Sequence, residues 1–465
     1  MEARTVQFIA SACAGQLLQG SSDVPVERIC TDSRQAQPGD VFFALAGERF
    51  DGHDFLGEVV KKGVSAIVAD RERMPADLRG CAVIAVEDAR KALGYFAARY
   101  RKDFGLPIVA IGGSNGKTTT KELATSVLRQ QLATVSSDAS FNNDIGVPLT
   151  LLKLGKSHQA AVMEVGTNHP GELAPLVKMI QPKFGVITSV GREHLEFFGD
   201  VAGVAREEGW LAELLPSDGK LFINGDSEWA DRISERARAR VVRAGFSERN
   251  EWRVRALRMS KLGTSFRIDA PKAELSGEYR INLLGRHQVV NALFAIAIGH
   301  ELGLGRPAIE KGLAECEPAK MRLQLWELKG VRVLDDAYNA NADSMVAALQ
   351  TLQELPCKGR RVAVLGDMAE QGTHSEAAHE EIGRRAAELG VVQLFAVGKM
   401  APVTARGARE AGLNRVFEFA DVETAAVAIK SFLKNGDVLL VKASRAARLE
   451  RIGEMLRSGE AARKN

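Results

Sequence analysis

The sequence lacks the marks of secreted, membrane-spanning and zinc-binding proteins. Its five cysteines are scattered along the chain, and no two of them stand in a CxxC spacing. Such a set predicts neither a disulfide framework nor a zinc site, and it fits a reducing cytosol. The longest apolar run, VVNALFAIAIG from Val289, is interrupted by Asn291 and is shorter than the about 20 residues of a membrane span. We therefore expect a cytoplasmic protein with no membrane partner.

A secretion signal and a strong charge of one sign are also absent. Near the N-terminus, FIASACAG is only a short apolar run, and Glu2 stands where a signal peptide needs positive charge. The net charge of +3 is small for 465 residues, which argues against binding of a polyanion through massed Lys and Arg. We interpret the basic cluster RARARVVR, Arg236 to Arg243, as a solvated helix face. We expect a monomer with no nucleic-acid partner.

The length and the pattern of apolar residues predict several α/β domains. A chain of 465 residues exceeds what one hydrophobic core usually serves. Short buried-strand runs alternate with helical periodicity, which is typical of mostly parallel sheets covered by helices. We expect domains at residues 1–104, 105–317 and 318–465, and a C-terminal amphipathic helix within RAARLERIGEMLRSGEAARK. The expected strands are SAIVAD, CAVIAVED, IVAI, AAVMEV, FGVITSV, KLFING, VRVLDD, RVAVLGD, LFAVG and VLLVKAS.

One stretch, PIVAIGGSNGKTTTKE from Pro107 to Glu122, predicts a phosphate-binding loop. A strand breaks into glycines and restarts as a helix, so backbone N–H groups and the positive helix end can face an anion. Lys117 would add a cation, and Thr118 would place a hydroxyl on Mg²⁺. The string departs from GxxxxGK[ST], because Ile111 stands where the first glycine would be. The loop indicates a bound nucleotide but does not name a reaction.

Two further residues follow predicted strands and are candidate metal ligands. Glu164 ends the apolar run AAVME, where the tip of a parallel strand would present a carboxylate to Mg²⁺ beside the nucleotide. A surface acid at a strand end is an equally good interpretation of this position alone. His194 follows the next strand in SVGREHLEFFG, and a single histidine is more often structural than a ligand.

Several motifs together identify a resemblance to a known family. In chain order they are TDSRQAQPGDVFFALAGERFDGHDF, GGSNGKTTTKE, FNNDIGVPLTLL, MEVGTNHPGE, REHLEFFG, LLGRHQVVNA, DDAYNANADSM, VLGDMAEQG and VKASR. The set resembles the ATP-dependent Mur ligases, and among them the members that add D-Ala-D-Ala to UDP-MurNAc-tripeptide. The resemblance implies an N-terminal domain for the UDP end of the precursor, a central P-loop ATPase and a C-terminal Rossmann-like domain that closes over the site.

The resemblance also implies roles for individual residues. Those expected at ATP are Gly113, Ser114, Asn115, Gly116, Lys117, Thr118, Thr119, His287, Asn291, Arg322 and Asp336. Those expected at the other substrates are Ser33 and Arg34 at the UDP end, and Asn143, Asn339, Lys442, Ser444 and Arg445. Asp336 and Asn339 would lie at the ribose or at the incoming dipeptide. Lys117, Glu164, His194 and Glu208 are the expected catalytic residues, and Thr118, Glu164, His194 and Glu208 the expected metal ligands.

Glu208 is included because the chain departs from the family there. After HLExFG the family usually carries a lysine that becomes a carbamate and holds a second metal ion. The corresponding run here is VAREEGW, which places Glu208, or alternatively Glu207, at that position. A glutamate keeps the negative charge without CO₂, but its side chain is shorter by about 3–4 Å. Our hypothesis is that Glu208 replaces the carbamate.

The implied reaction explains why these residue types occur together. A carboxylate is a poor electrophile, so ATP must first convert it to an acyl phosphate, which the amine of D-Ala-D-Ala then attacks. Neutralising the transferred phosphoryl group calls for the lysine, the hydroxyl and Mg²⁺. Most of the rate would come from positioning, so closure of the domains is expected.

Three alternatives remain at this point. The preceding Mur ligase, which adds the third amino acid, shares TDSR and the phosphate loop, but its diaminopimelate-specific form carries DNPR, a string not found here. Folylpolyglutamate synthase shares the central ATPase but not the N-terminal block. A nucleotide-binding module without ligase activity is the third alternative, because the family's lysine is missing.

Overall fold

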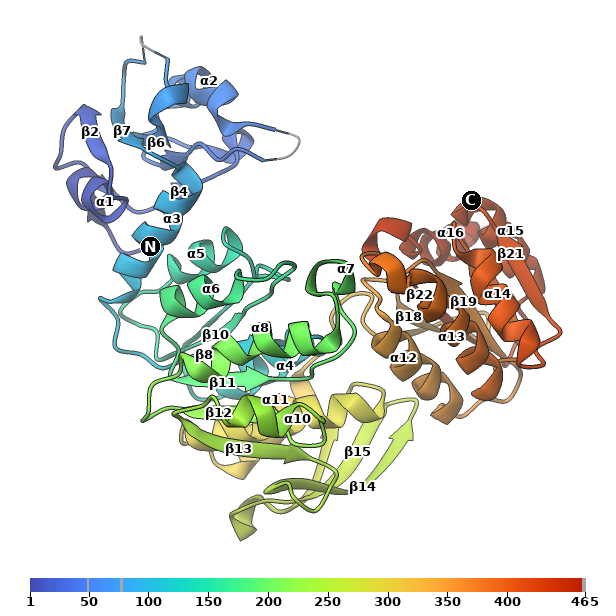
Figure 1. The fold of residues 1–465 in the computed structure, drawn as a ribbon. Coiled ribbons are helices and arrows are strands. Elements are labelled where there is room, and N and C mark those ends of the chain that lie inside the picture. Colours follow the sequence, from blue (N-terminus) through green and yellow to red (C-terminus); the bar gives the residue numbers. More distant parts are fainter. Residues whose placement is uncertain (48–49, 76–77, 462–465) are drawn as a thin grey trace.

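The computed structural model describes residues 1–47, 50–75 and 78–461, and it describes side chains as far as Arg457. Figure 1 shows three α/β bodies in chain order, each built around its own sheet. The central body lies between the other two, and the N-terminal and C-terminal bodies approach it from different sides (Figure 1). The three-domain α/β architecture predicted from the sequence is confirmed.

The N-terminal body contains a five-stranded sheet in which only the β2–β7 pair is antiparallel. Its order is β2 (Gln16–Gln19), β7 (Ala82–Val86), β6 (Ala66–Asp70), β5 (Val41–Phe43) and β4 (Ile29–Cys30). A separate ribbon pairs β1 (Arg4–Thr5) with β3 (Pro25–Val26). The helices are α1 (Val6–Ala12), α2 (Leu56–Lys61), α3 (Ala89–Arg101) and the 3₁₀ turns η1 (Ser33–Gln35), η2 (Gly52–Phe55) and η3 (Arg71–Arg73).

The central body contains a nine-stranded sheet that is parallel from β9 to β14 and antiparallel at β15 and β16. Its order is β16 (Gly277–Ile281), β15 (Gly263–Asp269), β14 (Trp252–Ser260), β13 (Arg240–Gly245), β12 (Lys220–Asn224), β11 (Phe184–Ile187), β8 (Ile108–Gly112), β10 (Ala160–Glu164) and β9 (Thr134–Ser136). The helices are α4 (Lys117–Leu128), α5 (Gly146–Leu151), α6 (Leu173–Ile180), α7 (Leu195–Phe198), α8 (Val201–Glu213), α9 (Ala230–Ser234), α10 (Arg286–Glu301), α11 (Arg306–Glu315) and η4 (Ala273–Leu275).

The C-terminal body contains a six-stranded sheet in which only the β17–β18 pair is antiparallel. Its order is β17 (Gln324–Leu328), β18 (Val331–Asp336), β22 (Val438–Lys442), β19 (Arg361–Gly366), β20 (Gln393–Val397) and β21 (Val416–Phe419). The helices are α12 (Ala342–Glu354), α13 (Ser375–Glu388), α14 (Ala401–Glu410), α15 (Val422–Phe432), α16 (Glu450–Ala461), η5 (Gly372–His374) and η6 (Arg445–Ala447). The predicted terminal helix is therefore present to Ala461, and residues 462–465 lie outside the described residues.

Strand β8 shows how the parallel sheet forms its two cores. Ile108 and Ala110 face one core and Val109 and Ile111 face the other, because successive side chains of a strand point to opposite faces. All four are fully buried, which explains why the parallel strands are continuous apolar runs in the sequence. The first core continues into the N-terminal body through α3, so these two bodies share packed apolar surface.

One local prediction is wrong. Arg236 to Arg243 do not form a helix face: α9 ends at Ser234 and β13 begins at Arg240. The arginines alternate with Val and Ala, and in β13 Val242 and Ala244 are buried whereas Arg240 is exposed, which is the two-residue repeat of a strand. In the part of the chain that the structure describes, no helix is long and apolar enough to cross a membrane.

Candidate active site

The predicted phosphate loop connects β8 to α4 and has the backbone of an anion cradle. Gly113 and Gly116 have φ values of +109° and +92°, a conformation that side chains with a Cβ rarely adopt. A Cβ on Gly113 would lie 2.5 Å from Thr188 Oγ1, and one on Gly116 would lie 2.7 Å from Asn291 Oδ1. Gly116 is also the N-cap of α4, whose first-turn N–H groups have no intrahelical partner. Backbone N–H groups arranged in this way suit a phosphate.

Lys117 supplies the cation of this loop. Its Nζ donates to Gly113 O at 2.5 Å and to Ser114 O at 3.4 Å, and it lies 3.6 Å from Glu193 Oε2. Burial alone would lower the pKa of Lys117, but the surrounding carboxylates, chiefly Glu193 and Glu208, raise it above its usual value. The ammonium therefore stays charged at neutral pH.

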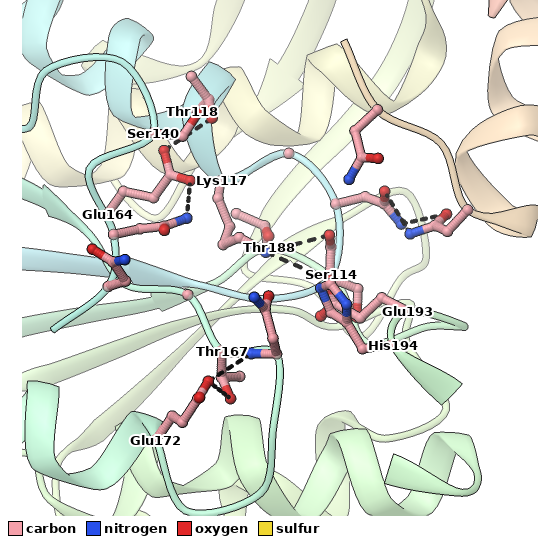
Figure 2. Close-up of a pocket in the computed structure, with 18 of the residues that line it drawn as sticks. Ser114, Lys117, Thr118, Ser140, Glu164, Thr167, Glu172, Thr188, Glu193 and His194 are labelled. Atoms are coloured by element: carbon pink, nitrogen blue, oxygen red, sulfur yellow. Dashed lines mark hydrogen bonds and ion pairs between the residues drawn. The ribbon is translucent and has the colours of Figure 1, made fainter. Parts of the chain in front are cut away.

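Glu164, at the end of β10, is held by two donors beside the loop (Figure 2). Thr118 Oγ1 donates to its Oε2 at 2.9 Å, and Asn142 Nδ2 donates to its Oε1 at 2.9 Å. The carboxylate is almost fully buried and is paired with neutral donors only. A hydroxyl and a carboxylate next to a phosphate cradle are the oxygen ligands that Mg²⁺ uses together with nucleotide phosphates, so these residues fit the ion.

Residues from all three bodies line one cavity of about 1570 Å³ around this loop. It contains most of the residues predicted from the sequence: Ser114, Asn115, Gly116, Lys117, Thr118, Thr119, Asn143, Glu164, His194, His287, Asn291, Arg322, Asp336, Asn339, Lys442, Ser444 and Arg445. The N-terminal body contributes residues of α3, including Arg90 and Tyr95. The cavity therefore joins the phosphate loop to surfaces of both outer bodies.

The C-terminal wall of the cavity carries paired charges and an aromatic ring. Lys442 is buried, and its Nζ donates to Asp336 Oδ2 at 2.6 Å and to Asn339 O at 3.0 Å. The Arg322 guanidinium lies 4.3 Å from the centre of the Tyr338 ring. These residues form a polar wall of the same cavity that the phosphate loop lines.

His287 stands on the first turn of α10, at the same cavity. Burial, together with the positive charge of Lys442, lowers the pKa of His287 to about 4, although Asp336 acts in the opposite direction. The imidazole is therefore neutral at physiological pH. A neutral ring can both donate and accept a hydrogen bond, as recognition of a base or ribose requires.

His194 is placed differently from the other expected metal ligands. Its backbone is left-handed, with φ of +48°, and its Nδ1 contacts Glu370 Oε2 of the C-terminal body. Within the described ranges, no group of three or more His, Cys, Asp or Glu residues is arranged to hold a metal ion. Mg²⁺ usually takes one or two carboxylates and completes its shell with waters and phosphates. Thr118 and Glu164 fit such a site, and the metal role of His194 stays a prediction.

Ser33 and Arg34, expected at the UDP end, lie in η1 of the N-terminal body and are not among the residues of the main cavity. Ser33 is buried, and its carbonyl accepts from Lys62 Nζ at 2.8 Å. Arg34 is exposed and pairs with Asp32 at 2.8 Å. Their role at a nucleotide sugar stays a prediction.

Glu208 lies behind the phosphate loop, on α8. Its Oε2 accepts from Gly113 N at 2.7 Å, and the residue is 1% exposed. Its Oε1 is buried and has no hydrogen-bond partner among the residues that the structure describes. Glu207, the alternative position, accepts from Gly171 N at 3.0 Å and Leu173 N at 2.9 Å and so fixes the start of α6. Glu208 is therefore the one whose second oxygen is left for a proton or a cation, and its metal role stays a prediction.

The surroundings of Glu208 lead to a testable pH dependence. Burial, with the charge of Glu193 added, raises the pKa of Glu208 to about 8, against the opposing effect of Lys117. The folded protein therefore holds this proton up to about pH 8, whereas the unfolded chain releases it near pH 4.5, so stability is lost as the pH rises between these values. In metal-free buffer, Glu208→Gln should raise the melting temperature more at pH 8.5 than at pH 5.5. An equal shift at both pH values would contradict the buried, protonated carboxyl.

Glu208→Ala is the matched comparison for this prediction. Gln can still accept from Gly113 N through its amide oxygen, whereas Ala removes that acceptor and leaves a cavity behind the loop. We expect Ala to lower the melting temperature at every pH, because an unsatisfied buried N–H and an unfilled cavity both destabilise.

Several residues of the site were not predicted from the sequence. Glu193 pairs with Lys117, Asn142 holds Glu164, and Ser189 accepts from the N–H groups of Ser114 and Asn115 at 2.8 Å each. Asn142 and Glu193 do stand inside the motifs FNNDIG and REHLEFFG, next to residues that were selected. Only the folded arrangement shows which neighbour of each pair faces the loop.

Comparison with known proteins shows the same succession of three domains along most of the chain. Three family models match in order: the Mur ligase family catalytic domain at residues 25–101, the Mur ligase middle domain at 111–299, and the Mur ligase glutamate ligase domain at 321–445. The UDP-N-acetylmuramoyl-tripeptide--D-alanyl-D-alanine ligase of Escherichia coli K12 is 36% identical over 94% of each chain.

Solved structures show the same likeness in three dimensions. A crystal structure of MurF from Acinetobacter baumannii has a TM-score of 0.90 and 32% identity, covering 98% of this chain and 99% of its own. MurF from Thermotoga maritima, in complex with ADP, has a TM-score of 0.82 and 26% identity, covering 94% and 99%. With full-length relatives above 30% identity and matches to all three family models, the chain belongs to the Mur ligase family.

Proposed function

We propose that this protein is the ATP-dependent ligase that joins D-Ala-D-Ala to UDP-MurNAc-tripeptide, giving UDP-MurNAc-pentapeptide, ADP and phosphate. The observation that carries the proposal is the single cavity in which the phosphate loop faces polar walls from both outer bodies. A reaction with one nucleotide and two further substrates needs one cavity in which all three can bind next to each other. The resemblance over nearly the full chain to the Escherichia coli UDP-N-acetylmuramoyl-tripeptide--D-alanyl-D-alanine ligase supports the choice of substrates.

The first step is transfer of the γ-phosphoryl group to the terminal carboxylate of the tripeptide. One carboxylate oxygen attacks phosphorus and the bond to the bridging oxygen breaks, so an acyl phosphate and ADP form. Lys117 and the first turn of α4 stabilise the charge on the phosphoryl oxygens. Mg²⁺ held by Thr118 and Glu164 would neutralise further phosphate charge. Asn142 keeps the Glu164 carboxylate turned toward the loop.

In the second step the amine of D-Ala-D-Ala attacks the acyl carbon, and phosphate leaves from the tetrahedral intermediate. We place the arriving amine at the C-terminal wall, because Asn339 and Lys442 of that wall line the same cavity as the phosphate loop. We infer that this wall orients the dipeptide, and that docking of the C-terminal body excludes water, which would otherwise hydrolyse the acyl phosphate.

We also propose domain boundaries at 104/105 and 317/318, a monomeric state and a cytoplasmic location. The boundaries fall between the sheets, in the segments that link α3 to β8 and α11 to β17. All five cysteines are free thiols, which supports a reducing compartment.

Phosphate release by the purified protein tests the proposal. With ATP, Mg²⁺, UDP-MurNAc-tripeptide and D-Ala-D-Ala present, we expect phosphate release that stops when any one component is omitted, together with a UDP-MurNAc-pentapeptide product identified by mass. Release that proceeds with a free third amino acid and UDP-MurNAc-dipeptide would instead identify the preceding ligase. Binding of ATP without release in any mixture would mean that the chain has lost ligase activity.

A further inference from the structure

The loop at residues 189–194, after β11, shapes the phosphate loop from one side. Ser189 O accepts from Ser114 N and Ser189 Oγ accepts from Asn115 N, each at 2.8 Å. Gly191 N donates to Ser114 Oγ at 2.9 Å. Glu193, which pairs with Lys117, belongs to the same segment. A movement of this supporting loop would therefore be passed to the groups that face the ATP phosphates.

Arg192 of the same supporting loop binds the C-terminal body. Arg192 N and Nε donate to the Asp343 carboxylate on α12 at 2.7 and 2.8 Å. Its Nη1 pairs with Glu381 Oε2 on α13 at 2.5 Å. About a third of each of the three side chains is exposed. One arginine of the central body is thus held by two carboxylates from two helices of the C-terminal body.

Two further contacts show that α12 is fitted closely to this region. A Cβ on Gly191 would lie 2.3 Å from Asp343 Oδ2, so only glycine lets the carboxylate approach. Asn341, the N-cap of α12, exchanges hydrogen bonds with Asn115 of the phosphate loop at 3.1 and 3.4 Å. The N-terminal turn of α12 therefore reaches the phosphate loop both directly and through Arg192.

We propose that Arg192, with Asp343 and Glu381, is a docking latch that ties the position of the C-terminal body to the geometry of the phosphate loop. The inference rests on the proposed function, in which the C-terminal wall brings the amine to the acyl phosphate. Arg192 is a positioning residue and not a catalytic one, because it reaches the phosphate site only through the supporting loop. When the latch forms, the C-terminal body is docked, and the position of the phosphate loop is fixed at the same time.

The latch predicts a specific kinetic pattern. Nine of the eleven residues expected at ATP lie in the central body and two, Arg322 and Asp336, in the C-terminal body, so breaking the latch should lower the docked fraction and reduce ATP affinity less than it reduces kcat. Arg192→Ala should therefore reduce kcat for ligation about fivefold to tenfold, a size suited to a partly exposed charge network. Arg192→Lys, which keeps one ion pair but not the forked geometry, should recover part of the loss.

The experiment measures phosphate release, ATP affinity and small-angle scattering for the full chain and its variants. With Mg²⁺ and a non-hydrolysable ATP analogue, Arg192→Ala and Gly191→Ala should give a larger radius of gyration than wild type. In a double-mutant cycle, the effects of Arg192→Ala and Glu381→Ala on kcat should be non-additive, because each change breaks the same Arg192–Glu381 contact. Arg406→Ala is the matched control, since Arg406 also bridges two glutamates, at 3.0 and 2.8 Å, but within the C-terminal body.

The outcomes separate the latch from the proposed function. Wild-type kcat and wild-type scattering in Arg192→Ala would overturn the latch, and so would an effect equal to that of Arg406→Ala. A loss of ATP affinity larger than the loss of kcat, together with wild-type scattering, would overturn it too, because it would show a structural role in the loop without any role in docking. If wild type itself releases no phosphate, the proposed function fails, while the scattering data still decide whether Arg192 holds the docked arrangement.

Discussion

A Lys117→Met variant is expected to form product about 10²- to 10³-fold more slowly than wild type, the usual cost of removing one preorganised group that stabilises developing charge. Lys117 Nζ donates to two carbonyls of the phosphate loop, Gly113 O and Ser114 O, and the surrounding carboxylates raise its pKa. It therefore remains charged throughout the pH range of an assay. Methionine keeps the apolar stem and the packing, so the loss reports the charge. Steady-state phosphate release with all substrates saturating measures it.

Lys311→Met provides the control for Lys117, because Lys311 lies on α11 with 65% of its side chain exposed, 3.8 Å from Glu315. It should keep wild-type activity. The folding of Lys117→Met is checked by its melting temperature, since removal of Lys117 leaves Glu193 without its partner. A properly folded Lys117→Met that retains more than a third of wild-type activity would show that phosphate transfer does not depend on this ammonium.

The parallel core of the fold could be predicted from the sequence because its strands are buried on both faces. IVAI and AAVME became β8 and β10, with every residue of both strands buried. The antiparallel edge was not predicted. In β14, Trp252 and Val254 are buried but most later residues are exposed, so the apolar signal is weak there. A strand with arginines at 253, 255 and 258 resembles a polar segment until its two partner strands are known.

The residues of the candidate site also differ in whether a local sequence pattern could predict them. Gly113, Gly116 and Lys117 are set by local backbone geometry between a strand and a helix, and a short string is enough to predict them. Asn341 and Asp343 reach the site only because the C-terminal body docks, and no local pattern marks that contact. Glu208 is intermediate: its position was predicted, but its hydrogen bond to Gly113 N depends on how α8 crosses behind the loop.

Glu164→Gln is the second change for which we expect a large effect. The substitution keeps the shape of the side chain but removes its charge and one of its two acceptor oxygens. Either Thr118 or Asn142, which donate to the two oxygens at 2.9 Å, would then face an amide N–H. We expect kcat to fall about 10²-fold and the Mg²⁺ concentration for half-maximal activity to rise about tenfold or more. A Mg²⁺ titration of phosphate release at saturating ATP measures both.

Glu164→Asp separates the two contributions, charge and position. Aspartate keeps the negative charge but is one carbon–carbon bond shorter, so it reaches Mg²⁺ only with a shift of the ion or a bridging water. If charge at this strand end is what matters, Asp should retain more activity than Gln and a lower Mg²⁺ requirement. If position matters more, the two variants should be equally impaired. Glu315→Gln serves as the control, because the Glu315 side chain on α11 is 53% exposed. A wild-type Mg²⁺ profile in Glu164→Gln would mean that the ion is held by the phosphates and Thr118 without this carboxylate.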